Sequence, residues 1–139
     1  VEEVIPTLVK NIAKGEKLSF TLPDGTRVWL NSGSTIAYPE KFGADQRLVK
    51  MEGEAFFEIE KDSLRPFRIV ANGFVTTALG TSFNLKAKET SGLQVSLITG
   101  KVRTISPMEL KRISRIFNRS FVKNYTKIQK LLLLLVMLD

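Results

Sequence analysis

Residues 47–59 read RLVKMEGEAFFEI and form the longest stretch in which apolar and polar side chains alternate. A period of two is typical of a β-strand with one buried face. Gly53 lies in the middle of the stretch, and a glycine inside a strand usually marks a bulge or a close approach of another backbone segment. The stretch therefore predicts one long strand with an irregularity at its centre.

Shorter alternating segments lie on both sides of this strand and are separated by turn signals. Pro23-Asp24-Gly25 is one such turn, because proline presets φ and glycine accepts positive φ, and Asn72-Gly73 is typical of a type I′ hairpin. We predict an all-β body of about eight or nine strands, arranged as an antiparallel sandwich, a jelly roll or a small barrel. The predicted strands are residues 17–22, 27–31, 36–38, 47–59, 67–71, 74–79, 82–87, 93–97 and 102–104.

The chain divides into three segments by pattern and charge. Residues 1–16 show no clean period and are expected to be a lead-in that is irregular or forms an edge. Residues 17–104 make up the β domain. Residues 105–139 form a tail without glycine that holds 7 basic and 2 acidic side chains, whereas residues 1–104 hold 14 and 12. The basic excess of the chain therefore gives no reason to expect that the β domain binds nucleic acid.

Composition excludes several kinds of site. The 139 residues suit one domain with its own core, and they include no histidine and no cysteine. A zinc finger, a thiol nucleophile and a Ser-His-Asp triad all need one of these residues, so none of them is available.

Glu52, Glu54, Glu58 and Glu60 are the best candidates for acid–base chemistry. Alternate residues of a strand share a face, so two neighbouring carboxylates would lie side by side, as glycoside hydrolysis requires. We favour a simpler interpretation, a solvated or salt-bridged strand face, because no other feature indicates a substrate cleft. The alternative hypothesis is a carbohydrate-binding or carbohydrate-active β-sandwich that uses Glu54 and Glu58, or a neighbouring pair.

The remaining motifs indicate no chemistry. The aspartates lack the dense spacing of a calcium loop, and the glycines match neither a phosphate loop nor a dinucleotide fingerprint. Trp29 and the nine phenylalanines could stack on bases or sugars, but at strand spacing they are predicted to fill the core. We therefore predict no enzyme, no catalytic residue, no metal site and no cofactor. The aspartates weighed as calcium ligands are Asp24, Asp45 and Asp62, and the glycines weighed as nucleotide-binding loops are Gly53, Gly80 and Gly100.

Five sequence blocks occur in an order that goes beyond a generic β pattern. They are LPDGTRVWLN at 22–31, GEAFFEI at 53–59, RPF at 65–67, LGTSFN at 79–84 and GKV at 100–102. Together they resemble the FecR domain, the periplasmic portion of bacterial anti-sigma regulators, in the form common among Bacteroidetes. The resemblance covers about residues 15–103.

The resemblance implies a signalling protein without an active site. Members of this family typically hold an extracytoplasmic-function (ECF) sigma factor with a cytoplasmic N-terminal region and carry one membrane helix. Their periplasmic part receives a signal from a TonB-dependent outer-membrane transducer. The sequence contains neither the cytoplasmic region nor the membrane helix, so it is expected to be the periplasmic domain of a single-pass inner-membrane protein. No sigma-contacting residue is therefore assigned.

Residues 105–139 depart from the family, whose members usually continue with more strand and a small mixed α/β domain. Ser106-Pro107-Met108-Glu109 predicts the start of a helix, because it is a capping box with proline at the first helical position. Apolar residues then recur at three- and four-residue steps among basic ones. We predict a basic amphipathic helix of up to ~24 residues.

Three interpretations of the tail remain open. The helix could pack its apolar face on the β body, or it could lie on an anionic membrane surface or in a partner's groove. The third interpretation is a frameshifted or truncated end that replaces the family's own sequence. The run from Leu131 to Leu138 is too short to span a bilayer, which takes ~20 residues.

Overall fold

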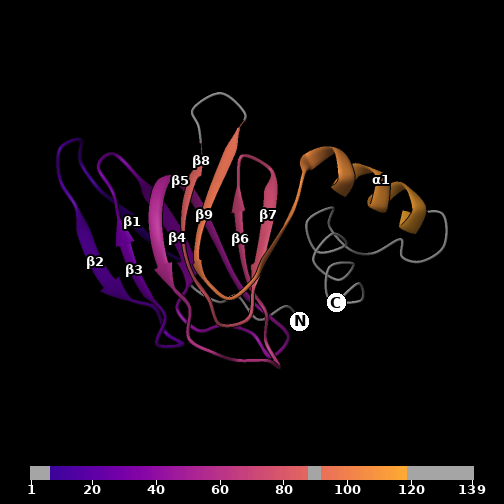
Figure 1. Ribbon diagram of the computed structural model, residues 1–139, viewed down its shortest axis with the longest axis horizontal. Coiled ribbons are helices and arrows are strands. Elements are labelled where there is room, and N and C mark those ends of the chain that lie inside the picture. Colours follow the sequence, from indigo (N-terminus) through magenta and orange to yellow (C-terminus); the bar gives the residue numbers. More distant parts are fainter. Residues whose placement is uncertain (1–6, 88–91, 119–139) are drawn as a thin grey trace. The chain divides into compact units, whose positions relative to one another are not determined.

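The computed structural model describes residues 7–87 and 92–118, which contain ten strands and one helix (Figure 1). The prediction of an all-β body with a C-terminal helix is confirmed. The chain separates into two compact units, residues 1–104 and 105–139. The elements are β1 (Thr7–Asn11), β2 (Leu18–Thr21), β3 (Arg27–Leu30), β4 (Thr35–Pro39), β5 (Arg47–Glu58), β6 (Phe67–Ala71), β7 (Phe74–Ala78), β8 (Ser82–Ala87), β9 (Leu93–Thr99), β10 (Val102–Ile105) and α1 (Pro107–Asn118).

The strand that sequence analysis did not count is β1, in the lead-in segment. It pairs antiparallel with β4, from Thr7 opposite Pro39 to Asn11 opposite Thr35. Four of its five residues are exposed. Because both faces of this edge strand meet solvent, its sequence needs no alternation of apolar and polar residues, and the period-two signal is absent.

Strand β5 belongs to both parts of the sheet. Its first half pairs with β4 and β6, in the order β1-β4-β5-β6-β7-β10, which we name part A. Its second half pairs with β3 and β8, in the order β2-β3-β5-β8-β9, which we name part B. One continuous strand therefore connects the two parts of the molecule.

Gly53 lies where β5 passes from part A into part B. Its φ is +94°, a conformation that side chains with a Cβ rarely adopt. A Cβ at this position would collide with Ser34, lying 2.8 Å from its Cβ and 2.9 Å from its Cα. Ser34 is buried, and its hydroxyl accepts a hydrogen bond from the Glu54 N–H at 2.8 Å. Of the two roles that a glycine inside a strand suggests, the close approach of another segment is confirmed.

One strand pair differs from the antiparallel prediction. After β5 has entered part B, residues 59–66 return the chain to the start of β5, and β6 runs beside it in parallel, with Arg47 opposite Phe67. The second half of β5 and the returning loop together supply the long crossover that a parallel pair requires. The other registered pairs are antiparallel, and Asn72-Gly73 forms the predicted hairpin turn with φ of 50° and 78°.

The inner faces of parts A and B share one core. The Phe20 and Tyr38 rings, from β2 and β4, stack with their centroids 5.9 Å apart. Phe57 of β5 contacts Phe67 of β6 and Phe83 of β8, at 6.0 and 5.5 Å between centroids. These three phenylalanines are fully buried. Aromatic side chains from both parts therefore fill the space between them, as in a sandwich.

Arg47, at the start of β5, is fully buried and binds segments that lie far apart in the sequence. Its Nη1 forms an ion pair with Asp24 Oδ2 at 2.7 Å, and the two side chains are 0% and 3% exposed. Its guanidinium lies 5.4 Å from the centre of the Phe67 ring. Its N–H groups also donate to the backbone carbonyls of Glu60 (2.6 Å), Arg65 (2.7 Å), Leu79 (3.2 Å) and Asp62 (3.4 Å).

The Arg47 contacts explain why three separate sequence blocks occur together. Block 22–31 supplies the carboxylate, block 65–67 supplies a carbonyl and the Phe67 ring, and block 79–84 supplies another carbonyl. Asp24 is itself fixed by the N–H and hydroxyl of Thr26, at 3.0 and 2.7 Å. Sequence analysis assigned Arg47 no role, because a buried arginine is recognisable only when its partners are known.

Helix α1 begins as predicted. The Ser106 hydroxyl accepts a hydrogen bond from the Glu109 N–H at 3.2 Å, and the Ser106 carbonyl accepts one from the Leu110 N–H at 3.0 Å. The rest of the predicted helix and the Leu131–Leu138 run lie outside the described residues. Within residues 7–87 and 92–118, no helix has the length and apolar character needed to cross a membrane. How the helix packs stays a prediction.

Replacing Gly53 with alanine tests the junction in β5. The unfavourable φ costs on the order of 1–3 kcal/mol, and the collision with Ser34 adds to it, so Gly53→Ala should strongly lower the free energy of unfolding. Gly15→Ala is the matched control, because Gly15 has a φ of +91° but no atom within 4 Å of the added Cβ. Urea denaturation of both variants separates the two costs; equal losses would contradict the close contact.

Replacing Arg47 tests the buried ion pair. Arg47→Met leaves the Asp24 carboxylate buried without a counter-charge, so we expect a loss of about 3–5 kcal/mol in the free energy of unfolding. The control is Arg65→Met, which removes the more exposed Arg65–Asp62 pair (31% and 26% exposed) and should cost much less. Chemical denaturation gives both values, and similar small losses would show that Arg47 is dispensable.

Candidate binding site

The four glutamates of the acid–base hypothesis do not form a reactive pair in this structure. Glu54 and Glu58 lie four residues apart on β5, roughly 13 Å at ~3.3 Å per residue, beyond the ~5–9.5 Å that glycoside hydrolysis uses. Glu52 and Glu54 lie on either side of Gly53, where β5 passes from part A into part B. Glu52 therefore pairs with Thr35 in part A, whereas Glu54 pairs with Lys86 in part B. Glu60 lies beyond the end of β5, with its side chain against Gly25. The geometry therefore gives no support to a catalytic carboxylate pair.

Glu54 is nevertheless the most organised of the four. Its Oε1 accepts a hydrogen bond from Asn31 Nδ2 at 2.6 Å, and its Oε2 accepts one from Asn84 Nδ2 at 2.7 Å. These hydrogen bonds, first from Asn84 and then from Asn31, hold the pKa of Glu54 below its usual value of 4.5, and Lys86 and Lys17 lower it further. The side chain is therefore a fixed carboxylate at neutral pH, an arrangement that suits ligand binding better than proton transfer.

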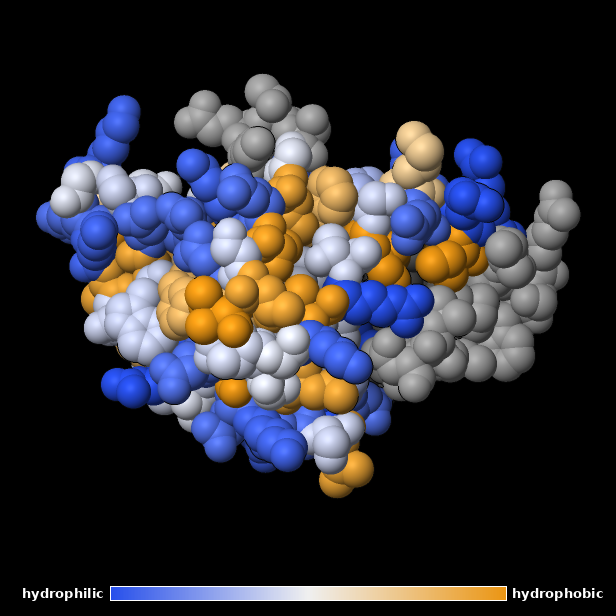
Figure 2. Space-filling view, viewed as in Figure 1, coloured by the Kyte–Doolittle hydropathy of each residue, from blue (hydrophilic) through white to orange (hydrophobic). Residues whose placement is uncertain are grey.

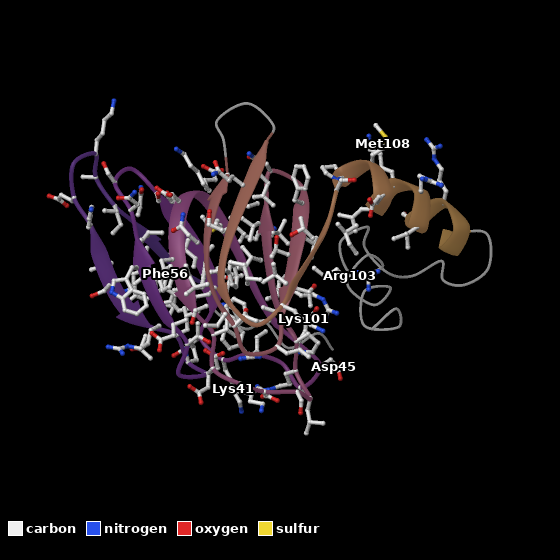
Figure 3. The ribbon with its side chains drawn as sticks, in the orientation of Figure 1. Lys41, Asp45, Phe56, Lys101, Arg103 and Met108 are labelled. Atoms are coloured by element: carbon white, nitrogen blue, oxygen red, sulfur yellow. The ribbon has the colours of Figure 1, made fainter. Side chains whose placement is uncertain are left out.

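Glu54 lies in a groove of about 420 Å³ on the outer face of part B. Trp29 and Phe56 also line this groove, with their ring centroids 5.5 Å apart and their planes tilted by 60° (Phe56 is labelled in Figure 3). The Arg27 guanidinium lies 5.4 Å from the centre of the Trp29 ring. Strands β2, β3, β5 and β8 thus bring together an aromatic pair, a fixed carboxylate and two amides.

Trp29 is not the core residue that sequence analysis predicted. Its side chain is 37% exposed, whereas its neighbours Val28 and Leu30 are 0% and 1% exposed. The alternation of the strand explains the difference, since Val28 and Leu30 share the inner face and Trp29 must point outward. The interpretation based on residue type was wrong here, and the pattern of the strand already contained the correct answer.

The groove also contains Asn31, Asn84 and Lys17, which sequence analysis did not single out, and Phe56, which it predicted to fill the core with the other phenylalanines. Phe56 and Asn84 lie on β5 and β8, whereas Lys17 precedes β2 and Asn31 follows β3. Their proximity depends on register: Trp29 lies opposite Phe56, and Phe56 lies opposite Asn84. The only indication in the sequence was that Asn31 is the last residue of the block LPDGTRVWLN and Asn84 is the last residue of the block LGTSFN. Without the strand order, nothing indicated that these two amides flank one carboxylate.

Two of the three aspartates considered as metal ligands, Asp24 and Asp62, have other partners. Asp24 binds Arg47 and Thr26, and Asp62 binds Arg65 at 2.8 Å. The hydrogen bond from Arg65 also lowers the pKa of Asp62 below its usual range. Across residues 7–87 and 92–118, no three His, Cys, Asp or Glu residues are grouped so as to hold a metal ion.

The family model described as FecR protein matches residues 10–103, which is more than half of the chain. The chain belongs to the FecR family. It is also similar to two crystal structures of a candidate anti-sigma factor from Parabacteroides distasonis ATCC 8503, at 2.50 and 1.65 Å resolution. Both are 36% identical to it, with TM-scores of 0.60 and 0.59. No significant match was found among curated protein sequences.

The match to the solved structures is partial on both sides. It covers 73% and 72% of this FecR chain and 52% and 51% of the two solved chains, so this chain spans about half of their length. Family membership and these neighbours support an anti-sigma-factor-like signalling domain. They assign no role to the groove residues.

The pKa of Glu54 gives a direct test of the amide contacts. Asn84→Ala removes the largest stabilising contact of the carboxylate, so the pKa of Glu54 should rise toward 4.5; Asn31→Ala should raise it less. The lowered pKa stabilises the folded state above pH 4.5, and this stabilisation is lost as pH falls through the lowered value. The stability difference between wild type and Asn84→Ala should therefore shrink in acid.

Carboxyl-carbon NMR titration measures this pKa, and denaturation at neutral and acidic pH measures the stability difference. Asn11→Ala is the control, because Asn11 lies on β1 and contacts Thr35 rather than Glu54. An unchanged pKa in Asn84→Ala would contradict the contacts described.

Proposed function

We propose that this chain is the periplasmic signalling domain of an anti-sigma factor, anchored by one helix in the inner membrane. In this proposal, the domain receives a signal from a TonB-dependent outer-membrane transducer and relays it to an ECF sigma factor. The sigma factor is contacted through a cytoplasmic region that this chain does not contain. The observation that carries the proposal is the FecR match over residues 10–103, together with 36% identity to a candidate anti-sigma factor of the same fold.

The geometry of the domain supports a binding role rather than an enzymatic one. The fully buried side chain of Arg47 directs its hydrogen bonds at loops of its own domain. Glu54 is held ionised by two amides, and Glu58, its partner in the hydrolysis hypothesis, lies roughly 13 Å away along β5 at ~3.3 Å per residue. The charged groups of Arg47 and Glu54 therefore hold the domain in one conformation. A module that transmits a signal by contact needs such a fixed conformation.

The test uses the intact periplasmic region of the full-length protein and the periplasmic signalling domain of the transducer encoded beside it. Isothermal titration calorimetry should show saturable binding. In cells, deletion of residues 7–104 from the full-length protein should disconnect sigma-dependent transcription from the inducer. Leu64→Ala is the matched control, because Leu64 is 86% exposed on the loop after β5 and its truncation should leave both readouts unchanged.

Two results would argue against the relay. One is absence of binding between the two intact periplasmic partners. The other is normal induction in cells that lack residues 7–104. Salt-sensitive binding to duplex DNA by the periplasmic region would also contradict the proposal, which includes no nucleic-acid partner.

A further inference from the structure

The outer face of part B carries side chains in register across five strands. One row runs from edge to edge through the aromatic pair: Ser19, Trp29, Phe56, Asn84 and Ser96. The adjacent row passes through the carboxylate and contains Glu54, Lys86 and Gln94. The two rows together, with Asn31 beside Glu54, form a surface that we name the platform.

The platform exposes aromatic area that the core does not use. Trp29 is 37% exposed, although fully buried phenylalanines fill the core on the other side of the same sheet. Arg27 lies over the indole and Phe56 lies against it, so the ring is held in one orientation. Figure 2 shows apolar side chains gathered in the middle of the visible face with hydrophilic ones around them. An ordered, exposed aromatic ring is a preformed surface for stacking.

The polar groups next to the aromatic pair are equally fixed. Each oxygen of Glu54 accepts one amide hydrogen bond, at 2.6 and 2.7 Å, and keeps a second lone pair for a ligand. The two oxygens therefore present neighbouring acceptors for two hydroxyl groups. The groove of about 420 Å³ that contains them is of the size of small-molecule sites.

Charge and polarity select the class of ligand. An anion would meet the ionised Glu54 in the groove, while a cation would meet Lys17, Lys86 and Arg27 around it. A purely apolar ligand would remove the Glu54 carboxylate from water without donating a hydrogen bond to it, and this desolvation would oppose binding. A neutral sugar ring has an apolar C–H face to lie on Trp29 and Phe56, and hydroxyl groups at its rim to bind Glu54.

We propose that the platform binds a neutral oligosaccharide, with a sugar ring stacked on Trp29 and two of its hydroxyl groups donating to Glu54. The row of Ser19, Asn84 and Ser96 extends from the stacking site to both edges of part B. Several sugar units of an extended chain therefore have polar partners along one line. This binding site is additional to the signalling relay and does not depend on it.

Trp29 is the single tryptophan of the chain, so its fluorescence reports on the platform alone. The 139-residue chain is titrated with cellohexaose, xylohexaose, laminarihexaose and maltohexaose, while amide NMR spectra are recorded on the same samples. We expect a saturable change in tryptophan emission with at least one hexasaccharide, and amide shifts confined to the strands of part B, β2, β3, β5, β8 and β9. Inorganic phosphate and spermine should give no such change.

Variants distinguish a built site from weak surface contact. Trp29→Ala and Glu54→Gln should each reduce the affinity, measured by calorimetry, by roughly tenfold or more. Both side chains are partly exposed, so their replacement should preserve the fold, which circular dichroism verifies. Leu64→Ala is the control and should bind like wild type.

Failure of all four hexasaccharides to give saturable emission or amide shifts on the platform would overturn the proposal. So would binding that survives both Trp29→Ala and Glu54→Gln. Protection of the platform by the transducer's signalling domain, with no saccharide binding, would assign the same surface to a protein partner and would equally refute the saccharide site.

Discussion

The buried guanidinium of Arg47 determines how the loops at one end of the domain are arranged. A guanidinium without partners in the interior would be prohibitively unstable, so each of its N–H groups must find an acceptor. The acceptors are one carboxylate and carbonyls from the two connections that flank β6 and β7. These polar contacts thereby fix the two loops to one another and to the start of β5. The family pattern of a DG turn, an RPF segment and an LGT segment corresponds to this one set of contacts.

From Arg47 the same strand continues out of part A and into part B. The first half of β5 holds the ion pair in part A, and its second half holds Glu54 and Phe56 in part B. Gly53 allows the passage, because only a residue without a Cβ can lie so close to Ser34 with positive φ. The conformation of Gly53 therefore determines how the outward-facing residues of β5, Glu54 and Phe56, pair with the neighbouring strands of the platform. Core and binding surface are two faces of one continuous strand.

Sequence reasoning succeeded where the physical signal is local. Alternation along 47–59, the Asn72-Gly73 turn and the capping box at Ser106 each depend on residues a few positions apart, and the structure confirms all three. It failed where the signal depends on strand order. The parallel pairing of β6, the partners of Arg47 and the amides around Glu54 are set by contacts between distant segments. For Trp29, the general preference of tryptophan for the interior was given more weight than the strand pattern, which correctly places it outside.

The partners of Arg47 also have a consequence for how the chain folds. The residues bonded to its side chain lie 13 to 32 positions away, and no single hairpin contains them all. A partly folded form that lacks one of these segments would bury the Arg47 guanidinium without all of its hydrogen-bond acceptors. Such partly folded forms are therefore unstable. Non-local closure of this kind slows folding, and it also makes the transition all-or-none. A domain built in this way has few stable intermediates between the unfolded chain and the complete sheet.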